Sequence, residues 1–541
     1  MSDLATLVRE YIDHFFAEVP EYATTHGYPW HDDELPDLSA DAFDVRARDD
    51  EAWHKRLTAI GDDGLAVDDR IDRDLVLSHL EGRRILRDWE DWRRLPDTYV
   101  GPPLNGLFAL FLRRPHPEPE LVRCAVARLD GVPALLDAGR ANLDAGLATT
   151  AIVERSMNQC RAAVTYVRDL LPVEVDDDQR RRHLAEAGAR AAEAYESFGA
   201  YLADLKARAT GTWEFGEHRY TAALQEKELL AYDAASLRDR GQTAYDELAA
   251  DMRQLAQRGW GTDDFRAVIT RLADERPHTP EEMRDGYEAA TERARAHLAA
   301  NELVTLPDGE RCDVVPSPPF LRPVLAVASY LRPPTFQPSR VGRFNVPYPP
   351  DGTSPEELAK RLANNSYAEM PTISVHEAYP GHHWHFSQLL ANRAGTRPIR
   401  CVLGTSYFTE GWALYAEAMM RERGLFTEPA HELAHLDARL FRAARIVVDV
   451  SLHCGDMAFD EAVTFMRAKA GLTEPVARAE VTRYCAWPTQ ASSYLTGSFE
   501  VERLRERWFA EDRGDLRSFH DTICGSGYLP IALAERALFD A

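Results

Sequence analysis

Hydrophobic residues recur at three- and four-residue spacing along most of the N-terminal half, and many of the positions between them are Ala, Arg or Glu. This spacing places the apolar side chains on one face of an α-helix, and the intervening residue types favour helix. Thr279 before Pro280 is a typical helix start, because the hydroxyl can cap the first turn and proline suits the first helical position. The pattern predicts a helical scaffold with helices over residues 3–18, 69–93, 118–146, 148–171, 178–208, 234–259, 262–274 and 280–302.

Between residues 303 and 350 the pattern changes to proline, glycine and alternating apolar residues. Alternation with a period of two is typical of short β-strands, and it occurs at Val324–Tyr330 and Gly342–Val346. We therefore predict a small antiparallel β-sheet here. A second candidate hairpin interrupts the helices near residues 210–221. From residue 354 onward the helical spacing returns, so the predicted fold class is mainly α.

Length and composition allow a large buried core, since the chain has 541 residues and 45% of them are hydrophobic. From the change in pattern we expect an N-terminal helical scaffold lobe over residues 1–302 and a second lobe over residues 303–541, joined as one integrated unit. The chain has no run of about 18 apolar residues, and its start mixes charged with apolar positions. Neither a membrane span nor a secretory signal is predicted, and we expect a cytoplasmic protein.

The charge balance narrows the class of partner. Against 63 basic side chains the chain carries 88 acidic ones, a formal net charge of −25. This charge repels polyanions, so we expect neither nucleic acid nor an anionic membrane as the main partner. The seven cysteines are scattered and form no CxxC pair, which argues against a disulfide framework and against a thiolate zinc site. Any metal must then be held by histidines and carboxylates.

The main chemical signal is the segment His-Glu-Ala-Tyr-Pro-Gly-His-His at residues 376–383. Its imidazoles stand beside the carboxylate of Glu377, and Thr-Glu-Gly-Trp-Ala-Leu-Tyr follows at residues 409–415. Two histidines, one glutamate and an open position commonly hold catalytic zinc, while a neighbouring glutamate directs a water molecule at the substrate. The combination predicts a zinc hydrolase site in which one ligand helix is broken.

The spacing of the histidines requires that break. His376 and His382 are six residues apart, about 600° of turn, so an unbroken helix would send their rings to different faces. Pro380-Gly381 lies between them, and a kink or bulge there can turn His382 back toward the ion. His383 lies nearer the face of His376 but roughly 10 Å along the helix axis. We therefore rank His382 above His383 as the second ligand.

A glutamate from the second segment completes the predicted ligand set. Thr409 can cap a helix that begins at Glu410, and Glu410 would then point from the first turn toward the metal. Glu417, two turns later, shares roughly its face. Glu410 could instead serve only to complement the helix dipole, but its position after the histidine segment favours the role of third ligand.

A literal HExxH motif, His431-Glu432-Leu433-Ala434-His435, is the main rival to this site. Such short motifs also occur by chance in helices that contain histidine and glutamate. This one follows a helix-start signal and belongs to an ordinary amphipathic stripe, and no clear strand precedes it. No downstream carboxylate stands in a Glu-Gly-Trp setting. We therefore favour the segment at 376–383.

These motifs carry a family resemblance. His-Glu-x-x-Pro-Gly-His-His followed by Glu-Gly-Trp-Ala-Leu-Tyr-Ala-Glu resembles the bacterial domain of unknown function 885 family, whose members are related to the gluzincin metallopeptidases. The resemblance extends to Arg445-x-x-x-Asp449-x-x-x-His453, to residues 488–497 and more loosely to the N-terminal helices. It therefore covers most of the chain.

The resemblance implies a large helical peptidase-like fold with a deep cleft and a small sheet beside a zinc site. It places Zn²⁺ on His376, His382 and Glu410, with Glu377 as the general base. Thermolysin-like enzymes carry a partner carboxylate four positions after the glutamate ligand, where this chain has Leu414. That partner must come from elsewhere in the chain.

Other residues are candidates for the remaining steps. The oxyanion formed on an amide needs a donor besides the metal, and Tyr494 is our first choice and His453 our second. Each of the two could equally be a buried structural side chain. Arg445 and Arg483 could clamp a substrate carboxylate, although both could instead form internal salt bridges. In the resembling segment, Gln490 is a further candidate substrate contact.

Two classes of function, an enzyme and a binding protein, agree with these residues. Phe344-Asn345-Val346 could be an edge strand that pairs with an extended peptide backbone. We expect a zinc-dependent hydrolase that cleaves short peptides or other amides, because a mainly helical enclosure would exclude folded proteins. The alternative is a non-catalytic helical protein that binds a peptide or small ligand on the same scaffold. The presence of the base beside all three ligands favours the enzyme.

Overall fold

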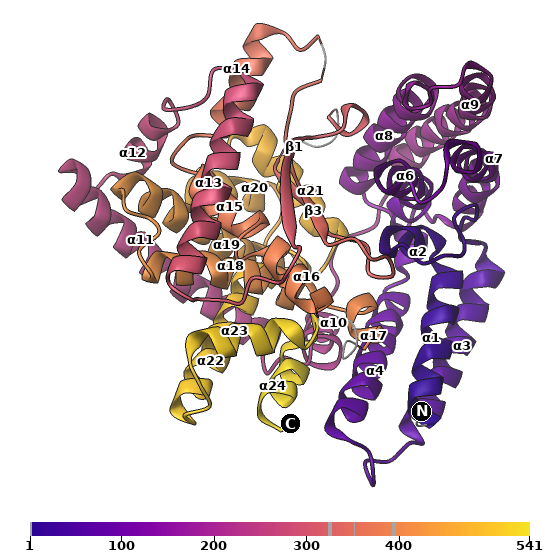
Figure 1. Cartoon of the computed structure of the whole chain (residues 1–541). Coiled ribbons are helices and arrows are strands. Elements are labelled where there is room, and N and C mark those ends of the chain that lie inside the picture. The colour runs from indigo at the N-terminus through magenta and orange to yellow at the C-terminus, as the bar shows by residue number, and fades with distance from the viewer. Residues whose placement is uncertain (1–2, 323–326, 351, 392–396, 541) are drawn as a thin grey trace. The chain divides into compact units, whose positions relative to one another are not determined.

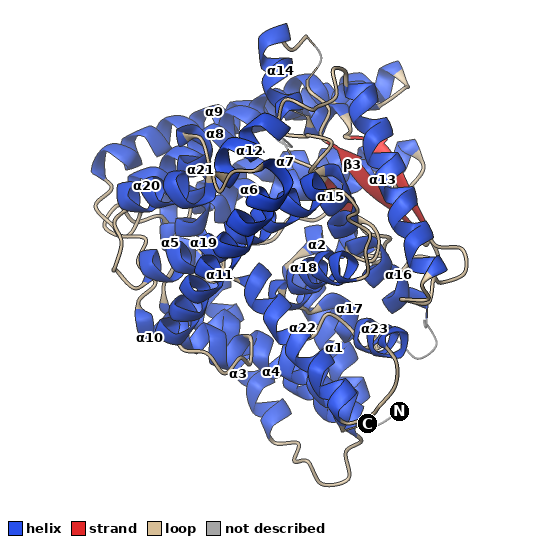
Figure 2. Cartoon of the chain, turned by 90° about the vertical axis from the view of Figure 1, so that its left-hand side faces the viewer, coloured by secondary structure: helices blue, strands red, loops and turns tan. Residues whose placement is uncertain are grey.

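The computed structural model describes residues 3–322, 327–350, 352–391 and 397–540, and helices make up most of it (Figures 1 and 2). The chain divides into two compact units. The first contains Met1–Trp213 and Pro334–Pro338, and the second contains Glu214–Pro333 and Ser339–Ala541. No helix among the described residues is long and apolar enough to cross a membrane. Each unit has its own core.

The first unit consists of helices and connecting loops, with no β-strand among its described residues. Its helices are α1 (Asp3–Glu18), α2 (Pro20–His26), α3 (Ala40–Thr58), α4 (Val67–Asp88), α5 (Asp91–Arg94), α6 (Asp97–Arg113), α7 (Glu118–Asn142), α8 (Thr150–Thr165) and α9 (Asp178–Arg208). The bounds of α1 and α9 match the prediction. The sequence pattern missed α3, whose buried apolar side chains are few, and α6, which contains Pro102 and Pro103. Packing within the unit stabilises both despite their weak local signal.

The hairpin predicted near residues 210–221 is wrong. The backbone N–H groups of Thr210 and Gly211 donate to the carbonyls of Ala145 and Ala148 at 2.9 Å each, so this segment bonds to a loop instead of pairing with itself. Residues 209–216 form no strand, and helix α10 follows at Glu217–Ala222. The alternation of polar and aromatic residues therefore does not indicate a strand here, because the segment is a short connection between helices.

The second unit combines helices with one small sheet. Its further helices are α11 (Ala234–Trp260), α12 (Phe265–Leu272), α13 (Pro280–Ala300), α14 (Pro355–Ala363), α15 (Met370–Glu377), α16 (His382–Ala391), α17 (Ile399–Val402), α18 (Ser406–Glu422), α19 (Pro429–His453), α20 (Phe459–Ala470), α21 (Glu474–Ala486), α22 (Ser493–Ala510), α23 (Leu516–Gly525) and α24 (Ile531–Phe539). The predicted cap of α13 is confirmed, because the Thr279 hydroxyl accepts the Glu282 N–H at 3.0 Å.

The unit boundary at Trp213 differs from the lobes predicted at 1–302 and 303–541. Helices α11 and α13 precede residue 302, yet they pack against α19 and α15 of the second unit. The change in residue pattern near 302 marks the entry of the chain into the sheet. It does not mark the limit of a packed unit, because packing of these helices is decided by contacts distant in sequence.

The sheet contains β1 (Arg311–Pro316), β2 (Ser329–Leu331) and β3 (Val341–Val346) in the order β1-β3-β2. Strand β3 confirms the prediction for Gly342–Val346, whereas part of the predicted Val324–Tyr330 strand lies outside the described residues. The sheet is mixed, not antiparallel, because β1 runs parallel to β3 and only β2 is antiparallel to it. Strand β2 precedes β3 in the chain but lies on the side of β3 opposite β1. The chain then turns back from β2 into β3, which therefore runs in the same direction as β1.

Helix α13 covers the sheet and connects it to the helical core (Figure 2). The Phe344 side chain of β3 is fully buried, and its ring lies 5.2 Å from that of Tyr287 on α13 in an edge-to-face arrangement. Helix α13 also packs against α15, which carries His376. The sheet and the first histidine of the motif are therefore held by the same helix.

Candidate metal centre

The helix that carries the first histidine ends at Glu377, and a new helix begins at His382. Between them the Tyr379–Pro380 peptide is cis, and the Gly381 N–H donates to the Val375 carbonyl at 2.9 Å. A Cβ at Gly381 would lie 1.9 Å from the His376 carbonyl oxygen, so only glycine allows this close approach of the backbone. The predicted break at Pro380-Gly381 is confirmed. It brings the rings of His376 and His382 to 4.8 Å between centroids.

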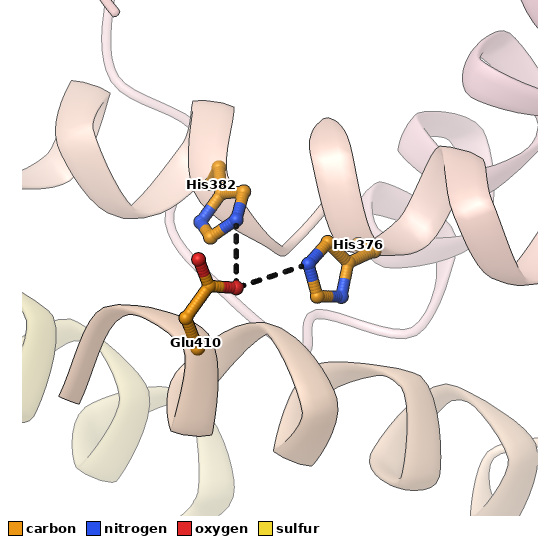
Figure 3. A group of neighbouring side chains, drawn as sticks. All are labelled: His376, His382 and Glu410. Atoms are coloured by element: carbon orange, nitrogen blue, oxygen red, sulfur yellow. Dashed lines mark ion pairs between the residues drawn. The ribbon is translucent and has the colours of Figure 1, made fainter. Parts of the chain in front are cut away.

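Three side chains from α15, α16 and α18 converge on one point (Figure 3). Oε2 of Glu410 lies 3.4 Å from Nε2 of His376 and 3.6 Å from Nε2 of His382. Bonds of about 2.0–2.1 Å from zinc to nitrogen or oxygen separate the ligand atoms of a tetrahedral site by roughly 3.4 Å. The three donors, all within 4.8 Å of one another, therefore fit a single small metal ion without rearrangement of the backbone.

Helix α18, which carries Glu410, begins earlier than predicted. Its first residue is Ser406, and the cap is Thr405, whose hydroxyl accepts the Tyr407 N–H at 3.1 Å and donates to the buried carboxylate of Glu228. Thr409 is not the cap, because its own hydroxyl already donates to the Thr405 carbonyl inside the helix. Glu410 consequently lies in the second turn, where the backbone is held by helical hydrogen bonds.

A carboxylate that the motifs did not assign supports the first histidine. Oε1 of Glu417 lies 2.8 Å from Nδ1 of His376, and Glu417 is two turns after Glu410 on the same face of α18. Its second oxygen accepts from the Thr372 hydroxyl at 2.8 Å and lies 3.3 Å from Nδ1 of His435. Glu417 is therefore the partner carboxylate that the sequence lacked at Leu414, and it leaves Nε2 of His376 to face Glu410.

His383 is directed away from this point. Its Nε2 lies 2.8 Å from Oε2 of Glu310, and its Nδ1 lies 2.9 Å from the Tyr330 hydroxyl of β2. Glu310 also accepts from Tyr379 at 2.6 Å and from Arg295 at 2.8 Å. Both ring nitrogens of His383 are engaged, which agrees with the ranking of His382 as the ligand. The role of His383 is to fasten the broken turn to the sheet.

The charge states of the cluster follow from burial and close pairing. Burial alone would lower the pKa of His376, but hydrogen bonds to Glu410 and Glu417 outweigh it and raise that pKa to about 10. Burial alone would raise the pKa of Glu410, and the hydrogen bonds from His376 and His382 instead hold it well below its usual range. The two carboxylates therefore favour positive charge at this point. A divalent cation would also supply positive charge there.

Glu377 stands beside the cluster with its carboxylate uncommitted. It is the residue that follows His376, and it makes no hydrogen bond to any residue that the structure describes. Burial raises the pKa of its carboxyl group, an effect that the charges of His376 and His382 partly oppose. A carboxylate with a raised pKa and no partner beside candidate metal ligands is the arrangement expected of a proton acceptor.

Two glycines bring Tyr494 close to Glu410. Helices α18 and α22 cross where Gly411 meets Gly497, and a Cβ at Gly411 would lie 2.5 Å from the Gly497 Cα. Tyr494 lies one turn before Gly497, and the carboxylate of Glu410 adds to burial in raising the pKa of the tyrosine. The Tyr494 hydroxyl accepts from Nε2 of Gln490 at 3.4 Å. The sequence-predicted Tyr494 and Gln490 are thus neighbours on the Glu410 side of the cluster.

The predicted arginines form an internal network next to Tyr494. Nη2 of Arg445 donates to Glu480 at 2.7 Å, and Nη2 of Arg483 donates to the same carboxylate oxygen at 3.1 Å. Arg483 also donates to Oε1 of Gln490. The guanidinium carbon of Arg445 lies 5.0 Å from the ring centroid of Tyr494. The two arginines therefore form internal salt bridges, as the alternative interpretation expected, and they also lie near the candidate site.

His453 occupies a buried network of its own. It is fully buried, its Nε2 lies 3.0 Å from the Tyr484 carbonyl, and its ring contacts those of Phe215 and Tyr220. Asp449 lies one turn earlier and accepts from Tyr220 at 2.6 Å. A side chain with no exposed surface cannot donate to a substrate oxyanion. The structure therefore favours the structural interpretation of His453.

The predicted edge strand at Phe344 and Asn345 is wrong. Strand β3 is central, with β1 paired along its whole length and β2 paired at residues 343–345. Both edges of β3 are occupied by protein backbone there, so a peptide cannot pair with it. Phe344 is a core residue, and the buried Oδ1 of Asn345 has no hydrogen-bond partner among the described residues. Strand order depends on chain crossings that the local pattern does not encode.

The rival motif holds no metal cluster. Among the residues that the structure describes, the two groups of candidate metal ligands are His376 with His382 and Glu410, and His14 with Glu18 and Asp49. Within the rival HExxH, Glu432 instead pairs with Arg421 at 2.9 Å. Its second histidine, His435, contacts Glu417 from the far side, and its first, His431, lies 3.9 Å from Glu428. The motif contributes one supporting contact to the candidate centre and not a centre of its own.

The comparison with family models decides the relationship. The model described as "Bacterial protein of unknown function (DUF885)" matches residues 20–538. This chain belongs to the DUF885 family. The comparison with curated proteins finds no match.

Two solved structures share the fold of this DUF885 chain. One is described as a "putative lipoprotein of unknown function" from Shewanella oneidensis, with 20% sequence identity, a TM-score of 0.80 and 99% of each chain covered. The other, from Colwellia psychrerythraea and also described as a "putative lipoprotein", has 20% identity and a TM-score of 0.82, with 99% of this chain and 98% of that chain covered. At 20% identity, the similarity shows a shared fold over the whole length of the chain.

Glu310, Tyr330 and Thr372 are residues of the DUF885 site that sequence reasoning missed. Each contacts a motif residue or its partner through a single polar atom, and each is far from the motif in sequence or carries no special spacing. For Glu417, helical periodicity placed the side chain on roughly the same face as Glu410, but no sequence pattern assigned it to His376.

Proposed function

We propose that this DUF885 chain is a zinc-dependent hydrolase that cleaves amide bonds of short peptides. The observation that carries the proposal is the convergence of His376, His382 and Glu410 with an uncommitted carboxylate, Glu377, beside them. Two imidazoles and one carboxylate with a further open position are the donor set of catalytic zinc, whereas structural zinc sites are closed by four protein ligands.

The metal would be held by Nε2 of His376, Nε2 of His382 and Oε2 of Glu410. Bound there, zinc would supply a Lewis acid and make an attacking water more acidic near neutral pH. The hydrogen bond between His376 and Glu417 fixes the tautomer of the ring and its orientation toward the shared point. The tie from His383 to Glu310 and Tyr330 holds the turn before His382 in place.

The chain's own residues supply the proton transfer and the polar contacts. Glu377 would accept the proton of the attacking water and later return it to the amine that leaves, which keeps the proton count balanced. The Tyr494 hydroxyl would donate to the oxygen that gains negative charge. Its acceptance of the weak hydrogen bond from Gln490, at 3.4 Å, leaves the hydroxyl hydrogen available for that contact.

The test compares Glu377→Gln with the wild-type chain. We expect about one zinc per chain in both proteins and a loss of peptide hydrolysis of at least roughly a hundredfold in the variant, because the base is removed and the ligands remain. Metal analysis and hydrolysis of a dipeptide and tripeptide library, with free and blocked termini, provide the measurements.

A matched control is Glu432→Gln, which changes the glutamate of the rival HExxH. It pairs with Arg421 at the surface and should retain both zinc and turnover. Equal turnover by Glu377→Gln and the wild type would reject the mechanism. Loss of turnover in Glu432→Gln, with turnover kept in Glu377→Gln, would transfer the centre to the rival motif, whose glutamate would then be the base.

A further inference from the structure

We infer that the site selects peptides with a free C-terminal carboxylate and that Arg445 binds this carboxylate. The inference rests on the proposed function for the reaction itself, but it concerns recognition and is testable by binding alone. The metal cluster by itself does not determine which peptide terminus is recognised.

The starting point is the hydrogen bonding of Arg445. Its Nε donates to the Tyr484 hydroxyl at 3.1 Å, and its Nη2 donates to Glu480 at 2.7 Å. Its Nη1 makes no hydrogen bond to any described residue, and the side chain is only 9% exposed. A guanidinium carries five N–H donors in a rigid fork, so one end of this buried fork is held and the other is available to an incoming acceptor.

The charges around Arg445 are unequal. Arg445 and Arg483 share the single carboxylate of Glu480, which also accepts from the Tyr484 hydroxyl at 2.7 Å. Two guanidinium groups therefore share one carboxylate through direct contacts, and the buried carboxylate of Asp449 acts on Arg483 from further away. Arg442, 5.9 Å from the Tyr494 ring centroid, instead lies near the carboxylate of Asp437. In a chain whose formal net charge is −25, this is a local region where a carboxylate is attracted and not repelled.

The network lies next to the candidate metal centre. The Arg445 guanidinium carbon is 5.0 Å from the Tyr494 ring centroid, and Tyr494 lies one turn before Gly497, which meets Gly411, the residue after Glu410. Glu410, Tyr494 and Arg445 thus follow one another in space, on α18, α22 and α19. A peptide whose scissile amide lies at the metal would extend its C-terminal side along Tyr494 toward the unpaired Nη1 of Arg445.

The free Nη1 end of the Arg445 guanidinium is better suited to a carboxylate than to a neutral amide or ester. Arginine binds carboxylates through charge-assisted hydrogen bonds, and a planar fork adds directional specificity. A neutral amide or ester terminus offers an acceptor without the charge, so its hydrogen bond to Nη1 would be weaker. Free-acid and amidated peptides of one sequence should therefore differ in affinity.

The experiment measures binding of Ala-Ala-Ala-Ala and its C-terminal amide to zinc-loaded Glu377→Gln chain by calorimetry, a variant in which hydrolysis is blocked. We expect the free acid to bind at least about tenfold more tightly, as for a hydrogen bond to a charged group. Adding Arg445→Gln should reduce this ratio to about one. Arg445→Lys, which keeps the charge beside Glu480 but loses the fork, should give an intermediate ratio and serves if the glutamine variant fails to fold.

Arg442→Gln is the matched control, since it removes the same charge beside the same ring from the same helix. It should keep most of the preference for the free acid. Equal binding of the two peptides by the chain with Arg445 intact, or failure to bind either, would overturn the inference. Hydrolysis of both peptides with equal kcat/KM would overturn it while leaving the hydrolase in place. Selective binding without hydrolysis of any peptide by the wild type would support the inference and reject the proposed function.

Discussion

At the scale of single residues, the candidate centre depends on polar contacts one step removed from the converging donors. Glu417 holds His376 through Nδ1, and Thr372 with His435 holds Glu417 in turn. Such contacts fix the ring that must present its other nitrogen. A ligand without this support would rotate and lose its alignment. The surroundings of His376 are therefore as important as its identity.

Replacement of Glu417 tests this support. Glu417→Gln keeps the shape of the side chain but removes the charge that accepts from His376, so the affinity for zinc should fall about 10- to 100-fold. Titration against a competing chelator measures the affinity. His431→Ala is the control, because His431 belongs to the rival motif and does not contact Glu417, and its affinity should equal that of the wild type. If Glu417→Gln bound zinc as tightly as the wild type, the supporting role would be wrong.

At the scale of elements, the crossing of α18 and α22 sets the position of Tyr494 relative to Glu410. The two helices approach at Gly411 and Gly497, where no side chain separates the backbones. A Cβ at Gly497 would lie 1.8 Å from the Tyr407 carbonyl oxygen, a distance at which backbone must move. Close packing of helices therefore requires glycine at this crossing, and the site depends on it.

Gly497→Ala should accordingly destabilise the protein. Because backbone and not a flexible side chain opposes the new methyl group, we expect the free energy of unfolding to fall by about 2 kcal/mol or more. Urea unfolding followed by circular dichroism measures the change, and the rate of peptide hydrolysis should fall with it. Gly525→Ala at the end of α23 meets nothing within 4 Å and should leave stability close to that of the wild type. Equal stability of the two variants would contradict the crossing.

At the scale of the whole molecule, buried neutral histidines link stability to pH. His520 is fully buried, its Nδ1 donates to the Leu303 carbonyl at 2.8 Å, and its Nε2 accepts from the Tyr415 hydroxyl at 2.7 Å. Acceptance at Nε2 requires the neutral ring, because a protonated ring has no lone pair there. Burial, chiefly, lowers the pKa of His520 to about 3. In the unfolded chain the ordinary pKa is about 6.5, so the unfolded state binds the extra proton between these values.

This histidine therefore stabilises the fold fully above pH of about 6.5, and its contribution is lost as the pH falls below that value. Between pH 7 and pH 5 the loss from His520 should be about 2 kcal/mol. His520→Gln has no titrating group at this position. Its free energy of unfolding should therefore fall by about 2 kcal/mol less than that of the wild type between pH 7 and pH 5. Urea unfolding at the two pH values, with chelator present in every sample, measures the difference. Parallel loss in the wild type and the variant would reject the assignment.

The comparison of sequence with structure separates two kinds of information. The sequence alone was enough to predict His376, His382 and Glu410 as one group of candidate ligands, with Glu377 beside them. It also predicted the break at Pro380-Gly381 and the helices with strong apolar periodicity. These features depend on the chemistry of neighbouring residues and on spacing along one element, both of which are present in the unfolded chain.

Tertiary structure alone decided the rest. The mixed order of the sheet, which places Phe344 in the centre and not at an edge, arises from a chain crossing. The contact of Glu310 with His383 and the meeting of Gly411 with Gly497 join segments that are far apart in sequence. Long-range contacts of this kind come from the packing of whole elements against one another, and no local pattern of residues encodes which distant element will be the neighbour.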